Sequence, residues 1–107
     1  MDIYKNLNRI DNAQKIVKHK TELQQCEFYM NMLMQPTLNS AQVYEAEQFA
    51  NNMYEVLKRE SPIIANENTS PVPRNIDAVD NLRMNLQAIH KMLTQIMIKG
   101  AKDIVNK

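Results

Sequence analysis

Residues 79–96 read VDNLRMNLQAIHKMLTQI. The apolar side chains recur at alternating steps of three and four, and they are Val79, Leu82, Leu86, Ile89, Leu93 and Ile96. This spacing places them in one row along a helix, where they are buried only against other helices. The stretch therefore predicts a long, heptad-patterned helix over about residues 76–105, in an all-α protein with bundle or coiled-coil packing.

A shorter apolar row predicts a second helix over about residues 40–59, and it consists of Val43, Ala46, Ala50, Met53 and Leu57. Asn39 is followed three residues later by Gln42, which is the pattern of a capping box at a helix start, and Ser40 is an equally good cap. Pro62 disfavours helical geometry at the residue before it, so we expect the helix to end shortly before this proline.

The first segment, about residues 3–34, has helical spacing in two apolar rows. One row contains Ile3, Leu7, Ile10 and Val17, and the other contains Ile16, Leu23, Cys26, Met30 and Leu33. Two offset rows indicate a helix with two neighbours, or a break near residues 11–15. Pro36 ends the helix, and the short connection to the second helix favours an antiparallel hairpin.

Residues 61–75 contain three of the four prolines and show no helical period, so we expect an extended connector. Such a connector allows the third helix to run either parallel or antiparallel to the second. The chain of 107 residues has the length of one domain. The sequence thus predicts a single three-helix domain over residues 1–107, a hairpin followed by a long third helix.

Composition limits the classes of function. Gly100 is the only glycine, whereas phosphate-binding loops and strained active-site turns usually need several. Cys26 is the only cysteine, which is typical of a reducing compartment. No apolar run reaches the length of a membrane span, and the N-terminus lacks the pattern of a secretion signal. We expect a protein of the cytoplasm or of a virus or phage particle.

The candidates for chemistry are few. Glu22 lies three residues after His19, but a di-metal site in a helical bundle needs Glu-x-x-His in two copies. Neither His19 nor His90, the only histidines, has a catalytic partner at meaningful spacing. Cys26 falls within an apolar row, where a thiol behaves as a small buried hydrophobe. We therefore expect no catalytic residue, no metal and no cofactor, and hence no enzyme.

A basic stretch in the first helix contains Lys15, Lys18 and Lys20, which are the candidates for phosphate contacts. These charges spread around much of the helix circumference, and no recognised DNA-binding motif accompanies them. The formal net charge of the chain is only +1. Nucleic acid is therefore not the expected partner.

Three methionines stand at alternate positions near the end of the first helix, Met30, Met32 and Met34. In a helix they cannot all face one core. They fit a docking surface for a partner helix and a helix end buried inside a bundle equally well. We count them among the expected interface residues, together with the row from Val79 to Ile96.

These patterns favour a non-enzymatic structural or assembly subunit that acts through helix–helix contacts and associates with itself. The first alternative is a small adaptor, inhibitor or chaperone, which binds a host or regulatory protein through the methionines or the connector. The second alternative is a nucleic-acid-associated protein that uses the basic first and third helices. The expected partner is a second copy of the chain or another helical protein.

Overall fold

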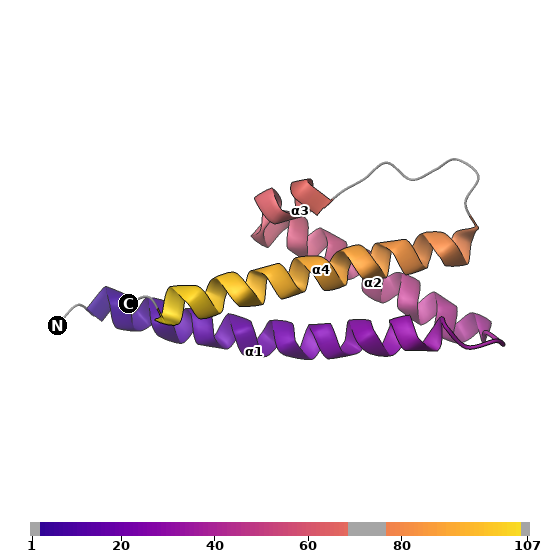
Figure 1. Ribbon diagram of the computed structural model, residues 1–107, viewed down its shortest axis with the longest axis horizontal. Coiled ribbons are helices and arrows are strands. Elements are labelled where there is room, and N and C mark those ends of the chain that lie inside the picture. The colour runs from indigo at the N-terminus through magenta and orange to yellow at the C-terminus, as the bar shows by residue number, and fades with distance from the viewer. Residues whose placement is uncertain (1–2, 69–76, 106–107) are drawn as a thin grey trace.

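The computed structural model describes residues 3–68 and 77–105, with side chains described for residues 13–14, 16–68 and 77–100. Within these ranges the chain forms four helices and no strand (Figure 1). The helices are α1 (Ile3–Met32), α2 (Ser40–Glu60), α3 (Pro62–Asn68) and α4 (Ala78–Val105). The all-α prediction is confirmed, whereas the predicted count of three helices is wrong.

The additional helix, α3, occupies the first half of the segment predicted to be an extended connector. Pro62 takes the first helical position, where its missing N–H group costs no helical hydrogen bond. The Asn68 side chain donates to the carbonyl oxygen of Ile64 at 2.8 Å and to the Gln95 side chain at 3.0 Å. Ala65 is buried in the core, so packing stabilises a helix that local sequence does not favour. Residues 69–75 of the predicted connector lie outside the described ranges.

Local side-chain chemistry explains the starts of two long helices. The Asn39 side chain accepts a hydrogen bond from the Ala41 N–H group at 2.8 Å, as expected for the cap of α2. The Asp77 side chain accepts from the Val79 N–H group at 2.8 Å and caps α4 in the same way. Helix α1 continues without a break through residues 11–15. Of its first apolar row, Val17 is 66% exposed, and the side chains of Ile3, Leu7 and Ile10 lie outside the described residues.

The relative directions of the helices follow from specific contacts. Ile16 and Glu27 of α1, and Leu33 just after it, lie beside Gly100, His90 and Arg83 of α4, in that order. Helices α1 and α4 are therefore antiparallel. Helix α1 is also antiparallel to α2, as the short connection predicts. Figure 1 shows α2 and α4 running in the same direction, which answers the question of direction that the sequence leaves open.

The core is formed where α1, α2 and α4 meet, and α3 adds Ala65. Its buried apolar residues are Cys26, Leu33, Ala46, Ala50, Met53, Leu57, Ala65, Leu82, Leu86, Ile89, Met92 and Leu93. Four residues of the α4 row are in this core, and Val79 and Ile96 pack against it. No coiled coil is evident, because α4 packs on three different helices instead of winding around one partner.

The molecule is elongated, with extents of 57 × 25 × 18 Å, and both chain ends lie at the same end of it (Figure 1). Helix α2 has 21 residues, against 30 in α1 and 28 in α4. Lys18 of α1 lies beside Glu60, the last residue of α2, so the start of α1 extends beyond α2. No helix in the described part of the chain is long and apolar enough to cross a membrane.

Candidate interaction surface

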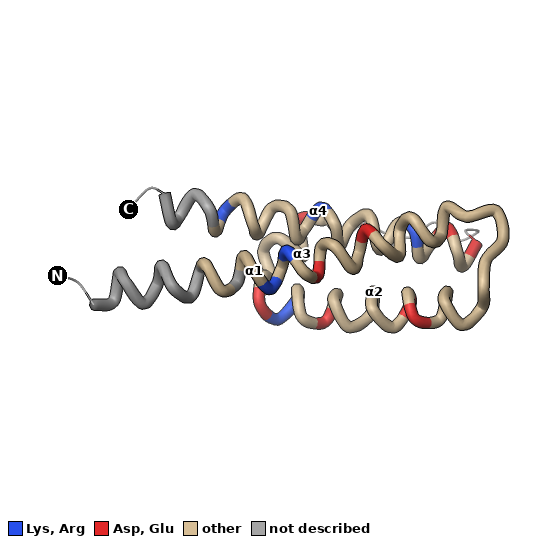
Figure 2. The backbone as a smooth tube through the Cα atoms, turned by 90° about the horizontal axis from the view of Figure 1, so that it is seen from below, with Lys and Arg blue, Asp and Glu red and all other residues tan. Residues whose placement is uncertain are grey.

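The hairpin that joins α1 to α2 has an unusual composition. Residues 28–44, which we call the hairpin tip, contain no charged side chain and read FYMNMLMQPTLNSAQVY. Figure 2 shows this part of the backbone without a coloured segment, between acidic residues on α1 and on α2. Protein interfaces are depleted in charge at their centres and enriched in aromatic residues and methionine. The hairpin tip has this composition.

Part of the apolar surface of the hairpin tip faces solvent. Phe28 is 62% exposed, Met34 is 76% exposed and Tyr44 is 61% exposed. They are three of the seven large hydrophobic residues that are exposed in the described part of the chain. Met30 and Met32, in contrast, pack against the core from the last turn of α1. The three methionines are thus divided, with two directed inwards and Met34 outwards in the turn.

Aromatic rings connect α1 to α2 at the base of the hairpin tip. The Phe28 and Tyr29 rings meet edge to face with centroids 5.5 Å apart, and the Tyr29 and Phe49 rings lie 5.1 Å apart. Tyr29 and Phe49 are half-buried, while Phe28 is mostly exposed. Such ring pairs are rigid and present a large apolar area, which is a common feature of interface anchors.

The backbone of the hairpin tip is held in place from α4. The Arg83 guanidinium donates to the carbonyl oxygen of Leu33 from Nε at 3.2 Å and from Nη2 at 2.5 Å, and its Nη1 contacts Asp80 at 2.7 Å. This carbonyl lies just past the end of α1, where carbonyl groups lack partners inside the helix. The surface is therefore presented by a fixed backbone.

The Cys26 thiol is buried beneath this surface and donates to the carbonyl oxygen of Leu86 at 3.2 Å. Burial, with the nearby Glu27 carboxylate as a smaller cause, raises the pKa of the Cys26 thiol to about 12. A nucleophilic cysteine needs a lowered pKa and access to solvent. The structure therefore supports the packing role that the sequence predicts for Cys26.

The two histidines lie in different environments. His90 Nε2 is 3.0 Å from Glu27 Oε1 on the surface between α4 and α1. His19 is buried, with Nδ1 at 3.6 Å from Glu22 Oε1. Within the described residues, no three His, Cys, Asp or Glu side chains come together as metal ligands.

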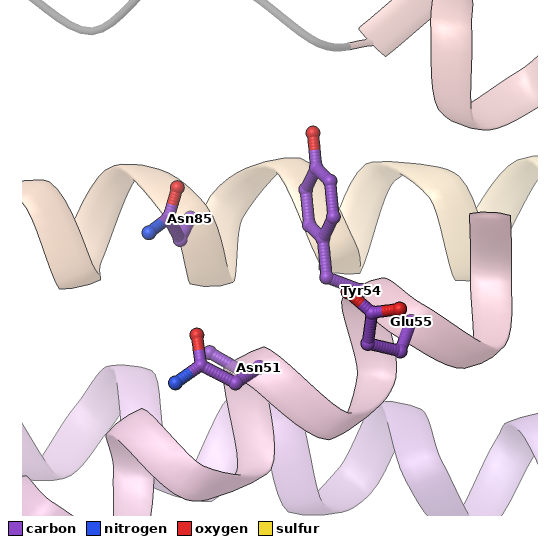
Figure 3. A pocket seen from close by; sticks show the side chains of 5 residues that line it. Asn51, Tyr54, Glu55 and Asn85 are labelled. Carbon is purple, nitrogen blue, oxygen red and sulfur yellow. The ribbon is translucent and has the colours of Figure 1, made fainter.

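A polar groove between α2 and α4 is a feature that sequence analysis missed. Figure 3 shows Asn51, Tyr54 and Glu55 of α2 and Asn85 of α4 around a hollow of about 280 Å³. A second hollow of about 250 Å³ shares Asn51 and Asn85 and reaches Asn81, whose buried Oδ1 has no hydrogen-bond partner. The one signal in the sequence that could have indicated it is the spacing of Asn81 and Asn85, one helical turn apart beside the apolar row.

Of the three predicted phosphate-contact residues, the structure describes the side chains of two. Lys18 is 3.6 Å from Glu60 and is thereby partly neutralised. Lys20 is exposed, and the side chain of Lys15 lies outside the described residues. Helix α2 adds Glu45, Glu47, Glu55 and Glu60 to the surface of the bundle, against Lys58 and Arg59. The predicted α4 row is buried inside the chain, as described above.

Comparisons with protein-family models, curated proteins and solved structures find no match to this chain. The surfaces of the described structure are therefore the basis for inferring a function. Of these, the hairpin tip combines exposed apolar side chains, absence of charge and a fixed backbone.

Proposed function

We propose that this protein is a non-enzymatic assembly subunit that acts through helix–helix contacts at its hairpin tip. The observation that carries the proposal is the exposure of Phe28, Met34 and Tyr44 on a stretch without charge. Single exposed hydrophobic residues are ordinary, but an uncharged segment with three of them is typical of a contact surface. The proposed partner is a second copy of the chain.

The buried α4 row is not available for self-association. Leu86, Ile89 and Leu93 are fully buried within one chain, so a second copy cannot use them while the chain stays folded. Of the residues expected at an interface, Met34 is the one whose side chain is mostly exposed. The proposed contact surface therefore moves from the third long helix to the end of the first.

An adaptor that binds a different helical protein is the second proposal. Met34 supports it, because methionine is flexible and polarisable and adapts to partner surfaces of varied shape. Nucleic-acid binding has less support, since Lys18 lies beside Glu60 and α2 adds four glutamates to the surface. The proposed location is the cytoplasm or a virus or phage particle.

The test is the absolute mass in solution, measured by light scattering behind a sizing column over about a hundredfold dilution. We expect a multiple of 12.5 kDa for the wild type and a monomer for the double variant Phe28→Ser/Met34→Ser. The matched control is Val17→Ser/Ile63→Ser, since these residues are 66% and 72% exposed and lie outside the hairpin tip.

Two outcomes contradict parts of the proposal, and a third reveals a general effect on folding. A wild-type monomer at every dilution overturns self-association and makes the capture of another helical protein by the hairpin tip the next test. An oligomer that is unaffected by Phe28→Ser/Met34→Ser but broken by the control variant places the contact elsewhere. Equal dissociation of both variants indicates a general loss of folding, which circular dichroism checks directly.

A further inference from the structure

The solvent-facing side of α1 carries a row of exposed side chains without charge, which we call the α1 outer row. Its members follow one another at helical steps of three and four, and they are Val17, Thr21, Gln24, Phe28 and Asn31. An exposed helix face usually carries charged as well as polar side chains, as α2 does with Glu55 and α4 with Lys91. Phe28 belongs both to this row and to the hairpin tip, so the uncharged surface continues from the hairpin tip along α1.

Two opposite charges flank the α1 outer row on one side. Lys20 and Glu27 are both exposed, and they are seven residues, or about two helical turns, apart on the same side of α1. This is the side next to α4, because Glu27 Oε1 lies 3.0 Å from Nε2 of His90. Gln24 lies between the two charges along the helix and is the middle residue of the row.

Two antiparallel copies of α1 can bring these opposite charges together. A two-fold axis places residue i of one copy opposite residue j of the other, and j opposite i. With the axis beside Gln24, Lys20 of each copy lies beside Glu27 of the other, and Thr21 lies opposite Phe28. The two Gln24 side chains then meet, and a carboxamide is complementary to its own copy because it both donates and accepts hydrogen bonds.

The same charges disfavour two other arrangements of α1 against α1. In a parallel pair each residue lies at the level of its own copy, so Lys20 of one copy would lie near Lys18 and Lys20 of the other. An antiparallel pair with its axis beside Phe28 would bring the two Glu27 carboxylates together. Like charges that face each other across an interface are unfavourable. Of these three arrangements, the axis beside Gln24 is the one that pairs opposite charges.

We propose that two copies of the chain pack through their α1 outer rows, antiparallel about a two-fold axis beside Gln24, with Lys20 of each copy paired to Glu27 of the other. This geometry rests on the self-association proposed above, and it closes at a dimer because both copies use the same surface. Phe28 lies about 6 Å from the axis along the helix, inside the contact. Val17 lies about 10 Å from the axis, at the rim, where substitutions change affinity little.

The experiment reverses the two charges separately. Lys20→Glu and Glu27→Lys each create two like-charged pairs across the axis, so we expect each to raise the dissociation constant of the dimer by at least about tenfold. An equal mixture of the two variants should form a heterodimer with a dissociation constant close to that of the wild type, because every like-charged pair is then replaced by an opposite pair. The matched control is Lys91→Glu, an exposed charge reversal on α4 that should leave the dissociation constant unchanged.

Light scattering over a dilution series at low salt, where screening is weakest, gives the dissociation constants, and circular dichroism confirms that each variant stays helical. Two results overturn this geometry without touching the hairpin tip: a wild-type dimer that Lys20→Glu does not weaken, and single variants that do not recover in the mixture. In both cases dissociation by Phe28→Ser/Met34→Ser still supports self-association at the hairpin tip. A wild type that is monomeric at every dilution overturns the proposed self-association and this geometry together.

Discussion

Arg83 and Leu33, 50 residues apart in the chain, are joined by two hydrogen bonds from one guanidinium group to one main-chain carbonyl. The carbonyl belongs to the first residue after α1, and the arginine lies in the second turn of α4. This contact attaches the hairpin tip to the start of α4. It therefore links the orientation of the proposed contact surface to the packing of the bundle.

Replacement of Arg83 by methionine is expected to lower the free energy of unfolding by about 1 kcal/mol. Hydrogen bonds from a charged donor contribute about 1.5–3 kcal/mol, and the value is reduced here because the side chain is 36% exposed. The measurement is chemical denaturation. Asp80→Asn is the control, because loss of the exposed Arg83–Asp80 ion pair should lower the free energy of unfolding by less than about 0.5 kcal/mol. Equal effects of the two substitutions would show that the Leu33 contact adds nothing.

Leu86→Ala should destabilise the folded monomer by about 2–5 kcal/mol, since it leaves a cavity at a fully buried position. Met84→Ala, two residues earlier and 42% exposed, should change stability by less than about 0.5 kcal/mol. Thermal unfolding followed by circular dichroism measures both. If the two substitutions had similar small effects, the α4 row would not be the core of a single chain.

Replacing both Leu86 and Leu93 by Asp should abolish most of the helicity, along with any association. Each substitution places a carboxylate at a position with no exposed surface. Circular dichroism and mass in solution report the two losses together. A variant with wild-type helicity and mass would contradict both the heptad pattern and the structure.

Cys26 should react slowly with a thiol reagent in the native protein at neutral pH and rapidly in urea. The pKa of about 12 leaves almost no thiolate, and the sulfur is buried. The raised pKa also has a consequence for stability, because the ordinary pKa of an exposed thiol is 9.0. The contribution of the protonated thiol is present below that value and is lost as pH rises towards 12. Native reactivity equal to that of a free thiol would disprove the buried position.

Gly100→Ala should leave stability within about 1 kcal/mol of the wild type, because alanine favours the helix and its Cβ meets only a side chain. That Cβ would lie 3.3 Å from Cγ1 of Ile16, close enough to require a small shift of the isoleucine. Gly100→Val should be clearly destabilising, because its larger side chain has to fit into the same short distance to Ile16. Chemical denaturation gives the free energy of unfolding of both variants. If Gly100→Val left it unchanged, α1 and α4 would be further apart than the structure shows.

The composition of the hairpin tip can be read from the sequence, but the exposure of its side chains cannot. The alternate spacing of the three methionines predicts that they do not all face one core, without indicating which is exposed, and the structure places Met34 outwards in the turn after α1. Phe28 and Tyr44 were missed, because an aromatic residue at a helical position is buried or exposed according to which neighbour covers it. The groove lined by Asn51 and Asn85 was missed for a related reason, since α2 and α4 have to lie side by side before the two amides share a surface.

The three long helices and their ends follow from local chemistry. Asn39 caps α2 with its own side chain, Pro36 interrupts the helix before it, and the apolar rows mark the buried faces. These effects act over a few residues, so they can be read along the chain. The short helix α3 depends instead on the burial of Ala65 and on the bond from Asn68 to Gln95. The direction of α4, and the covering of its apolar row by helices of the same chain, depend on contacts between distant segments, which no local pattern specifies.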